Sequence, residues 1–201
     1  MIVQTFEAGP LGANNYLLTD ENEAVLIDCS EVKQEILDEL KDKTLKYILL
    51  THGHFDHVLG VNGMKECTGA KILVHKDDIP RMEESASIMQ TFGVIGVETP
   101  KADAYINDND ILKFGNTEIK VIHTPGHTEG CVCYLIDGKL FSGDTLFRDS
   151  VGRCDLPGGN FSKLSDSIKN ILFKLDDNMV VYPGHGPETT IGYEKKYNEI
   201  I

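Results

Sequence analysis

Residues 51–57, with the sequence T-H-G-H-F-D-H, constrain the fold of this chain more than any other segment. They place three imidazoles and one carboxylate within six residues, on His52, His54, Asp56 and His57. Crowding these groups together is costly unless a metal ion compensates, and neutral imidazole and carboxylate suit zinc, iron or manganese. The segment follows the apolar residues 46–50, which are expected to form a buried strand. We therefore predict a metal site at the end of a strand, where the support is rigid.

Three residues in the second half of the chain are the candidates to complete this site. His127 follows T-P-G, Asp144 follows S-G, and His185 lies between two glycines. Glycine lets the backbone turn sharply and brings a neighbouring ligand close to a metal. Since the first cluster cannot fill the coordination of two metals, we expect His127, Asp144 and His185 to supply the rest. Taken singly, Asp144 would also fit an ordinary turn residue.

The other two histidines and the cysteines are expected to lie outside the site. His75 and His123 each stand alone in the sequence, which is typical of surface or hydrogen-bonded histidines. Cys131 and Cys133 are two residues apart in an apolar stretch, so we expect both to pack on one side of a strand. The odd total of five cysteines, without a signal peptide, argues against a disulfide framework.

The composition limits the partners and the location of the protein. Its net charge of −13 disfavours nonspecific binding to nucleic acid, because such binding needs a basic surface. No apolar run approaches the roughly 18 to 20 residues that span a bilayer, and the N-terminus lacks the features of a secretory signal. We expect a cytoplasmic protein of one domain, residues 1–201, that acts on a small molecule and binds no membrane.

The apolar patterning predicts an α+β protein. Strands are predicted at residues 2–7, 15–19, 24–28, 46–50, 71–75, 111–114, 118–123, 131–136, 139–142 and 179–182. Helices are predicted at residues 31–41, 58–66, 162–175 and 189–197, and Ser30 is the predicted N-terminal cap of the first of them. Residues 85–99 suit a movable lid over the site. Strands in both halves, each followed by helices, indicate two packed sheets with helices outside.

The motifs closely resemble those of the metallo-β-lactamase superfamily over nearly the whole chain. Residues 51–57 look like its H-x-H-x-D-H signature. T-P-G-H-T at 124–128, S-G-D-T-L-F at 142–147 and P-G-H-G at 183–186 are similar to its later motifs, in the same order. Within the superfamily, the chain looks most like the glyoxalase II-like hydrolases of the short bacterial type. Their motif G-R-x-D-L-P-G-G lies here at residues 152–159.

This resemblance implies a four-layer αββα sandwich of two mixed sheets with helices outside. It implies two divalent metals, of which zinc is expected and iron or manganese are alternatives. The ligand sets that it implies are His52, His54 and His127 for one metal, Asp56, His57 and His185 for the other, and Asp144 as the bridge. Two metals that share a water lower its pKa and polarise a carbonyl. Asp56 and Asp144 would thus be catalytic, with Asp56 also orienting the hydroxide.

The resemblance further implies hydrolysis of a thioester or ester, such as an S-acyl thiol of the hydroxyacylglutathione kind, by metal-bound hydroxide. Arg153 lies where that family has a lysine that binds a glutathione carboxylate, so it is a candidate substrate contact. Asp155 replaces the family's tyrosine, would repel an acidic substrate, and could instead pair with Arg153. Tyr182 is a second candidate substrate contact, because it lies close to His185. Glyoxalase II proper has a helical C-terminal domain, whereas here about 16 residues follow His185.

Other members of the superfamily match less well, and two other functions remain as alternatives. The main class of β-lactamases has a cysteine in place of Asp144, flavodiiron proteins have a glutamate in place of His54, and its nucleases add a large domain. The first alternative is a mononuclear iron persulfide dioxygenase that uses two histidines and Asp144 and leaves the other ligands idle. The second is a metal-binding scaffold or sensor without turnover, which complete ligand sets make less favoured.

Overall fold

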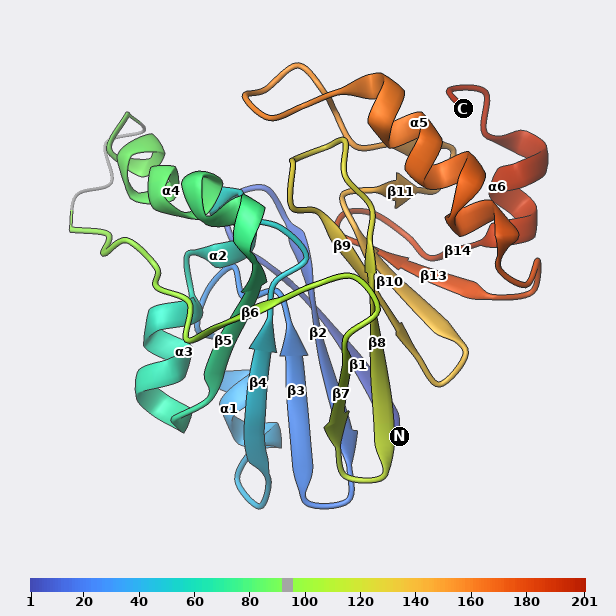
Figure 1. Ribbon diagram of the computed structural model, residues 1–201. Coiled ribbons are helices and arrows are strands. Elements are labelled where there is room, and N and C mark those ends of the chain that lie inside the picture. The colour runs from blue at the N-terminus through green and yellow to red at the C-terminus, as the bar shows by residue number, and fades with distance from the viewer. Residues whose placement is uncertain (92–95) are drawn as a thin grey trace.

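Two six-stranded sheets face each other in the computed structural model of this protein, which describes residues 1–91 and 96–201 (Figure 1). The first sheet has the order β1-β2-β3-β4-β5-β6. Its strands are β1 (Ile2–Ala8), β2 (Ala13–Asp20), β3 (Glu23–Ile27), β4 (Thr44–Leu49), β5 (Lys71–His75) and β6 (Ala104–Ile106). The pairs β1–β2 and β2–β3 are antiparallel and the others are parallel, so the sheet is mixed.

The second sheet comes from the second half of the chain and has the order β14-β13-β10-β9-β8-β7. Its strands are β7 (Ile111–Phe114), β8 (Thr117–His123), β9 (Val132–Ile136), β10 (Lys139–Gly143), β13 (Val180–Pro183) and β14 (Thr189–Thr190). Only the pairing of β10 with β13 is parallel within this sheet. A separate two-stranded ribbon joins β11 (Leu146–Phe147) to β12 (Ser150–Val151).

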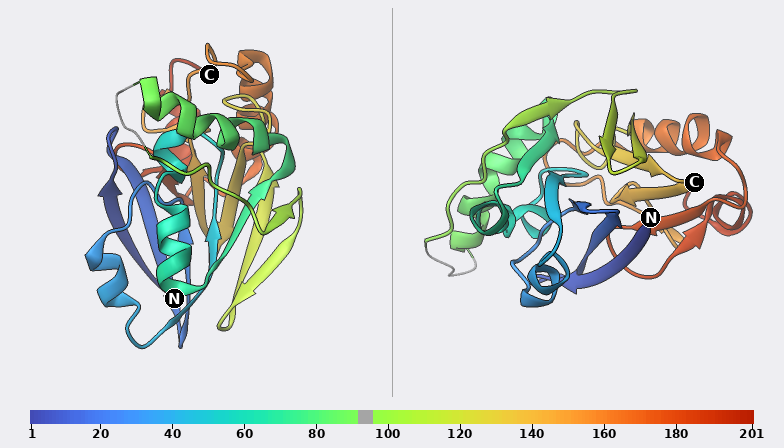
Figure 2. Two further views of the ribbon diagram at one scale, coloured as in Figure 1. Left: turned by 90° about the vertical axis from the view of Figure 1, so that its left-hand side faces the viewer. Right: turned by 90° about the horizontal axis from the view of Figure 1, so that it is seen from below.

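Helices cover the outer faces of both sheets. They are α1 (Gln34–Glu39), α2 (Phe55–Val58), α3 (Val61–Thr68), α4 (Ile79–Thr91), α5 (Phe161–Asn170) and α6 (Ile191–Tyr197), with the short 3-10 helices η1 (Lys76–Asp78) and η2 (Leu172–Lys174). The view from below in Figure 2 shows the blue and green helices beside the first sheet and the orange and red helices beside the second. This arrangement confirms the predicted αββα sandwich. Among the described helices, none has the length and apolar character needed to cross a membrane.

The four layers of helices and sheets are held together by buried apolar side chains, which form three apolar layers between them. Along β2 the side chains alternate, so that Leu17 packs under α1 and α3 while Tyr16 and Leu18 face the second sheet. Phe141 of β10 shares the central layer with Tyr16, and Leu140 packs outward against α5 and α6. Central strands such as β3 and β9 are therefore buried on both faces, which explains why they read as continuous apolar runs.

The structure corrects several predicted boundaries. Ser30 does not cap the first helix, because its backbone N–H and its hydroxyl bond to the Asn15 side chain at 2.6 and 3.1 Å. The helix instead begins at Gln34 after Lys33, which supplies no side-chain cap. The strands β6, β11, β12 and β14 were not predicted, because each has only two or three residues. The predicted lid at residues 85–99 overlaps α4, which ends at Thr91, and residues 92–95 of it lie outside the described part.

Candidate metal centre

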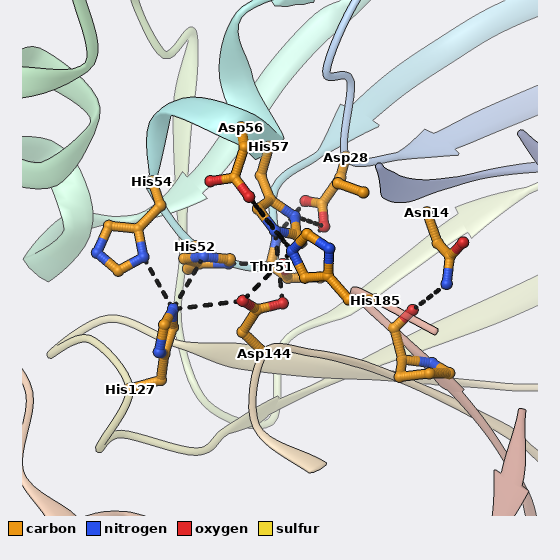
Figure 3. A network of polar contacts seen from close by, with 12 residues as sticks. Asn14, Asp28, Thr51, His52, His54, Asp56, His57, His127, Asp144 and His185 are labelled. Carbon is orange, nitrogen blue, oxygen red and sulfur yellow. Dashed lines mark hydrogen bonds and ion pairs between the residues drawn. The ribbon is translucent and has the colours of Figure 1, made fainter. Parts of the chain in front are cut away.

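The predicted ligands meet at one edge of the sandwich, toward which β3 and β4 point in Figure 1. Four connections bring them there: the segment from the end of β4 through α2, the turn after β8, the turn after β10 and the turn after β13. The Tyr134 hydroxyl donates to the Leu50 carbonyl at 2.6 Å and supports the first of these turns. Figure 3 shows the seven side chains from these four connections directed toward one point.

The first group contains His52, His54 and His127. The His54 Nδ1 atom lies 2.8 Å from His127 Nε2, which lies 3.3 Å from His52 Nε2. One nitrogen from each ring lies within 4.8 Å of the others, so the three could hold a metal ion. Three nitrogen atoms this close, with His52 and His127 buried, are better explained by a shared cation than by hydrogen bonds among imidazoles.

The second group contains Asp56, His57 and His185, which also lie within 4.8 Å of one another through one atom each. The His185 Nε2 atom is 3.2 Å from both Asp56 Oδ2 and His57 Nε2. Asp56 and His57 are buried, whereas the His185 side chain is 27% exposed. The second group therefore has an open side at His185, where a small molecule could approach.

Asp144 lies between the two groups, as Figure 3 shows. Its Oδ2 atom is 3.6 Å from His127 Nε2 in the first group and 3.7 Å from His185 Nε2 in the second. Its Oδ1 atom is buried and accepts no hydrogen bond from the described residues. A buried carboxylate oxygen without a donor is costly, and a metal ion shared by the two groups would satisfy it. The residues present therefore fit a pair of divalent cations.

The electrostatics of the centre favour bound cations. Burial, together with the neighbouring histidines, holds the pKa of His52 far below its usual value and lowers that of His54 to about 3. Both rings are therefore neutral and offer a lone pair. For His57, burial acts in the opposite direction to the Asp144 and Asp28 carboxylates, which together raise its pKa to about 10. These carboxylates stabilise a positive charge at His57, and a metal cation would take the place of that proton.

Asp28 is a further functional residue that the sequence reasoning missed. Its Oδ2 atom accepts from His57 Nδ1 and from the Thr51 hydroxyl, both at 2.8 Å, and its Oδ1 atom accepts from the Thr51 backbone N–H at 2.8 Å. The bond to Nδ1 turns the His57 Nε2 atom toward the centre, as carboxylates do behind metal-binding histidines. The signal available in the sequence was an aspartate directly after the apolar residues 24–27.

Two other supports hold the turns that carry His127 and His185. The His127 Nδ1 atom lies 2.7 Å from the Arg153 carbonyl, which accepts its N–H and leaves Nε2 facing the centre. The Asn14 amide donates to the carbonyls of Pro183 and Gly186 on either side of His185, at 3.0 and 2.9 Å. Gly184 is required here, because a Cβ at this position would lie 2.1 Å from Asp144 Oδ1.

Asp28→Asn is expected to weaken metal binding by about 10- to 100-fold, because the support behind His57 is lost. Asparagine suits the test, since Asp28 has a φ of 57° and asparagine tolerates that region. Competition with a chromogenic chelator measures the affinity, and Asp103→Asn is the control, because Asp103 accepts from Lys65 and the Ile72 N–H away from the centre. If Asp28→Asn binds metal with the wild-type affinity, Asp28 does not support His57 as a metal ligand.

The two predicted substrate contacts differ in their surroundings. Arg153 is 61% exposed and forms a two-point ion pair with Asp155, in which both N–O distances are 2.7 Å. The Tyr182 ring is stacked on Phe141 with a centroid distance of 4.9 Å and forms part of the central apolar layer. The predicted Arg153–Asp155 pair is therefore present, and the Tyr182 ring packs in the core, although its residue number is close to that of His185.

The cysteines do not contribute to the centre in the described structure. Cys131 and Cys133 are fully buried, as expected, and burial raises the pKa of the Cys133 thiol to about 11. All five cysteines carry free thiols, which agrees with the absence of a predicted disulfide framework. A buried, protonated thiol is a poor metal ligand.

Known proteins share both the sequence pattern and the fold. The model of the metallo-beta-lactamase superfamily matches residues 8–185. The chain is 34% identical to hydroxyacylglutathione hydrolase GloC from Haemophilus influenzae over 188 residues, which cover 90% of this chain and 89% of the relative.

Two crystal structures superpose closely on the chain, and each is 34% identical to it. One is the BLEG-1 B3 metallo-beta-lactamase, with a TM-score of 0.89 and coverage of 98% of both chains. The other is TTHA1623 in a di-iron-bound form, with a TM-score of 0.88 and coverage of 99% of this chain and 100% of that one. The second of these structures has the same fold and is in a di-iron-bound form. In this chain, the seven predicted ligands lie at one edge of that fold.

Proposed function

This chain belongs to the metallo-beta-lactamase superfamily, and we propose that it hydrolyses a thioester or ester at a centre of two divalent metal ions. The position of Asp144 between two complete groups of three ligands is the observation that carries this proposal. The similarity to a protein named hydroxyacylglutathione hydrolase supports a thioester as substrate. Zinc is the proposed metal, and iron is the alternative because of the di-iron form of a similar structure.

When bound, the two ions would lower the pKa of a shared water and polarise the substrate carbonyl. His52, His54 and His127 would hold one ion and Asp56, His57 and His185 the other. Asp144, which lies between the two groups, would supply carboxylate oxygens to the ions. Asp56 would have a second role. The hydrogen bond from His185 lowers the pKa of its buried carboxyl group against the effect of burial, and this carboxylate would accept a hydrogen bond from the attacking water and orient it.

The surroundings of the open side at His185 guide the proposal about the substrate. The Phe147 ring lies edge-on to His185 at a centroid distance of 6.2 Å, and a short apolar acyl group would pack on it. Arg153 is the proposed contact for an anionic group, although Asp155 already occupies two of its donors. Tyr182 is the weaker candidate, since its ring packs on Phe141. We therefore propose a substrate with a small acyl group and a thiol part of modest negative charge.

The test combines elemental analysis of protein purified without added metal with hydrolysis of S-lactoylglutathione and of a neutral S-acyl thiol of similar size. We expect about two metals per chain and turnover of both compounds. Arg153→Ala should raise the KM of S-lactoylglutathione more than that of the neutral compound. Two metals without any thioester turnover would overturn the proposed substrate class while leaving the metal centre intact.

The same preparation separates the alternative functions. One iron per chain, oxygen uptake with a glutathione persulfide and no thioester turnover would favour the mononuclear dioxygenase. Hydrolysis of a chromogenic β-lactam in preference to thioesters would favour the activity named for the BLEG-1 protein. Full metal occupancy with no turnover of any of these compounds would favour a scaffold or sensor.

A further inference from the structure

The two histidines that do not belong to the metal centre lie against each other. His75 ends β5 in the first sheet and His123 ends β8 in the second. Their rings are stacked with a centroid distance of 4.4 Å and an interplanar angle of 11°. The chain has seven histidines, and five of them belong to the metal centre. Every histidine thus lies in one of two clusters, which differs from the expectation that His75 and His123 stand alone.

Asp77 completes the second cluster with a carboxylate. One ligand atom from each of His75, Asp77 and His123 lies within 4.8 Å of the other two, the same limit that the main centre meets. The Asp77 Oδ2 atom is 3.8 Å from His75 Nδ1, and the Asp77 side chain is 48% exposed, so it can turn toward a ligand. Two imidazoles and one carboxylate make up a ligand set that divalent transition metals prefer over Mg²⁺ or Ca²⁺.

The hydrogen bonds around the pair leave a nitrogen lone pair available on His123 and a weakly held one on His75. His123 Nε2 donates to the Glu129 carbonyl at 3.0 Å, so its Nδ1 atom carries no proton in the neutral ring. Burial and the neighbouring His123 lower the pKa of His75, which keeps that ring neutral as well. Its Nδ1 atom accepts a long 3.3 Å bond from the Asp77 N–H, which a metal ion bound at Nδ1 would replace.

The cluster opens into a cavity of about 950 Å³ between η1, the turn after β8 and α5. The cavity is lined by Asp77 and His123 and by three further acidic residues, Asp108, Glu129 and Asp166. Lys76 and Lys163 are its basic residues, so acidic side chains are in excess. A hydrated cation can therefore reach Asp77 and His123 from solvent through an acidic opening, and the buried His75 ring lies directly behind His123.

We propose that His75, Asp77 and His123 form a second, separate site for one divalent transition-metal ion. Three protein ligands leave one or more positions of the ion open to water or to a small anion. The site joins η1 to the end of β8, only four residues before His127 of the main centre. An ion bound there would tie the first sheet to the second and restrain the turn that carries His127.

Equilibrium dialysis against micromolar Zn²⁺, followed by elemental analysis of the full chain, tests this site. Wild type should hold one more zinc per chain than His123→Ala. Asp77→Ala should lose the same ion or bind it at least tenfold more weakly. Asp166→Ala is the matched control, because it removes an equal charge from the same cavity but no proposed ligand, and it should keep the wild-type zinc content.

The result does not depend on the hydrolase proposal, because metal content is counted without an activity assay. Asp77 is exposed, so Asp77→Ala tests the site even if His123→Ala proves unstable. Equal zinc contents in wild type, His123→Ala and Asp77→Ala would overturn the proposal. So would an equal loss in Asp166→Ala, because the ion would then be held by the acidity of the cavity rather than by these ligands.

Discussion

Asp144→Ala is expected to lower kcat for thioester hydrolysis by about 10³-fold, because one metal is lost and a metal supplies several kcal/mol of transition-state stabilisation. The variant should also contain about one metal per chain fewer than the wild type. Asp144 contacts both ligand groups, with Oδ2 at 3.6 Å from His127 Nε2 and at 3.7 Å from His185 Nε2. The fold should survive, since Asp144 lies outside the three apolar layers. Steady-state kinetics and elemental analysis measure both effects.

The control for this substitution is Asp149→Asn, an exposed aspartate five residues further along that pairs with Arg148, and it should keep the wild-type rate. His185→Ala then separates the two metal-dependent functions. Both the dinuclear hydrolase and the mononuclear dioxygenase need Asp144, but only the hydrolase needs His185. If Asp144→Ala loses the activity of the wild type and His185→Ala keeps it, the result would favour the mononuclear centre. Two metals and full rate in Asp144→Ala would show that Asp144 does not bridge.

The sequence predicted the sandwich and the position of the centre because their signals are local. T-H-G-H-F-D-H is contiguous, and a glycine beside His127, Asp144 and His185 marks each later turn. The structure explains why one of these residues is glycine, since a side chain at Gly184 would collide with the Asp144 carboxylate. The apolar runs likewise predicted strands such as β3 and β9, whose residues are almost all buried.

What the sequence could not reveal depends on contacts between distant residues. Asp28 supports His57, which is 29 residues away in the sequence. Asn14 binds the carbonyl of Pro183, 169 residues away, and so holds the turn that carries His185. His75 and His123 are 48 residues apart and come from different sheets, so only the packing of the sheets brings their rings together. The prediction that Ser30 caps a helix was wrong for the same reason, because Ser30 instead bonds to the side chain of Asn15 on β2.

Removal of the metals is expected to abolish hydrolysis and to lower the melting temperature while the sandwich remains folded. A ligand present at a thousand times its Kd stabilises a protein by about 4 kcal/mol. For a domain of this size, each kcal/mol corresponds to about 2–4 °C, so we expect a decrease of about 8–16 °C. Without the ions, the Asp144 Oδ1 atom is left without a donor and the imidazoles of the first group crowd together.

Dialysis against a chelator, calorimetry and far-ultraviolet circular dichroism measure these changes, and zinc, iron and manganese are then added back separately. The metal that restores both rate and melting temperature identifies the native ion. Asp77→Ala belongs in the same experiment, because it lacks a ligand of the proposed second site and so isolates the stability that the main centre contributes. Chelated protein that is free of metal and still hydrolyses the thioester would show that the seven-residue centre is not the source of activity. If chelation lowers the melting temperature of Asp77→Ala by the full amount, the stabilising ions lie at Asp144 and its neighbours. An empty centre is costly there, because the Asp144 Oδ1 atom is buried without a hydrogen bond and the imidazoles are crowded.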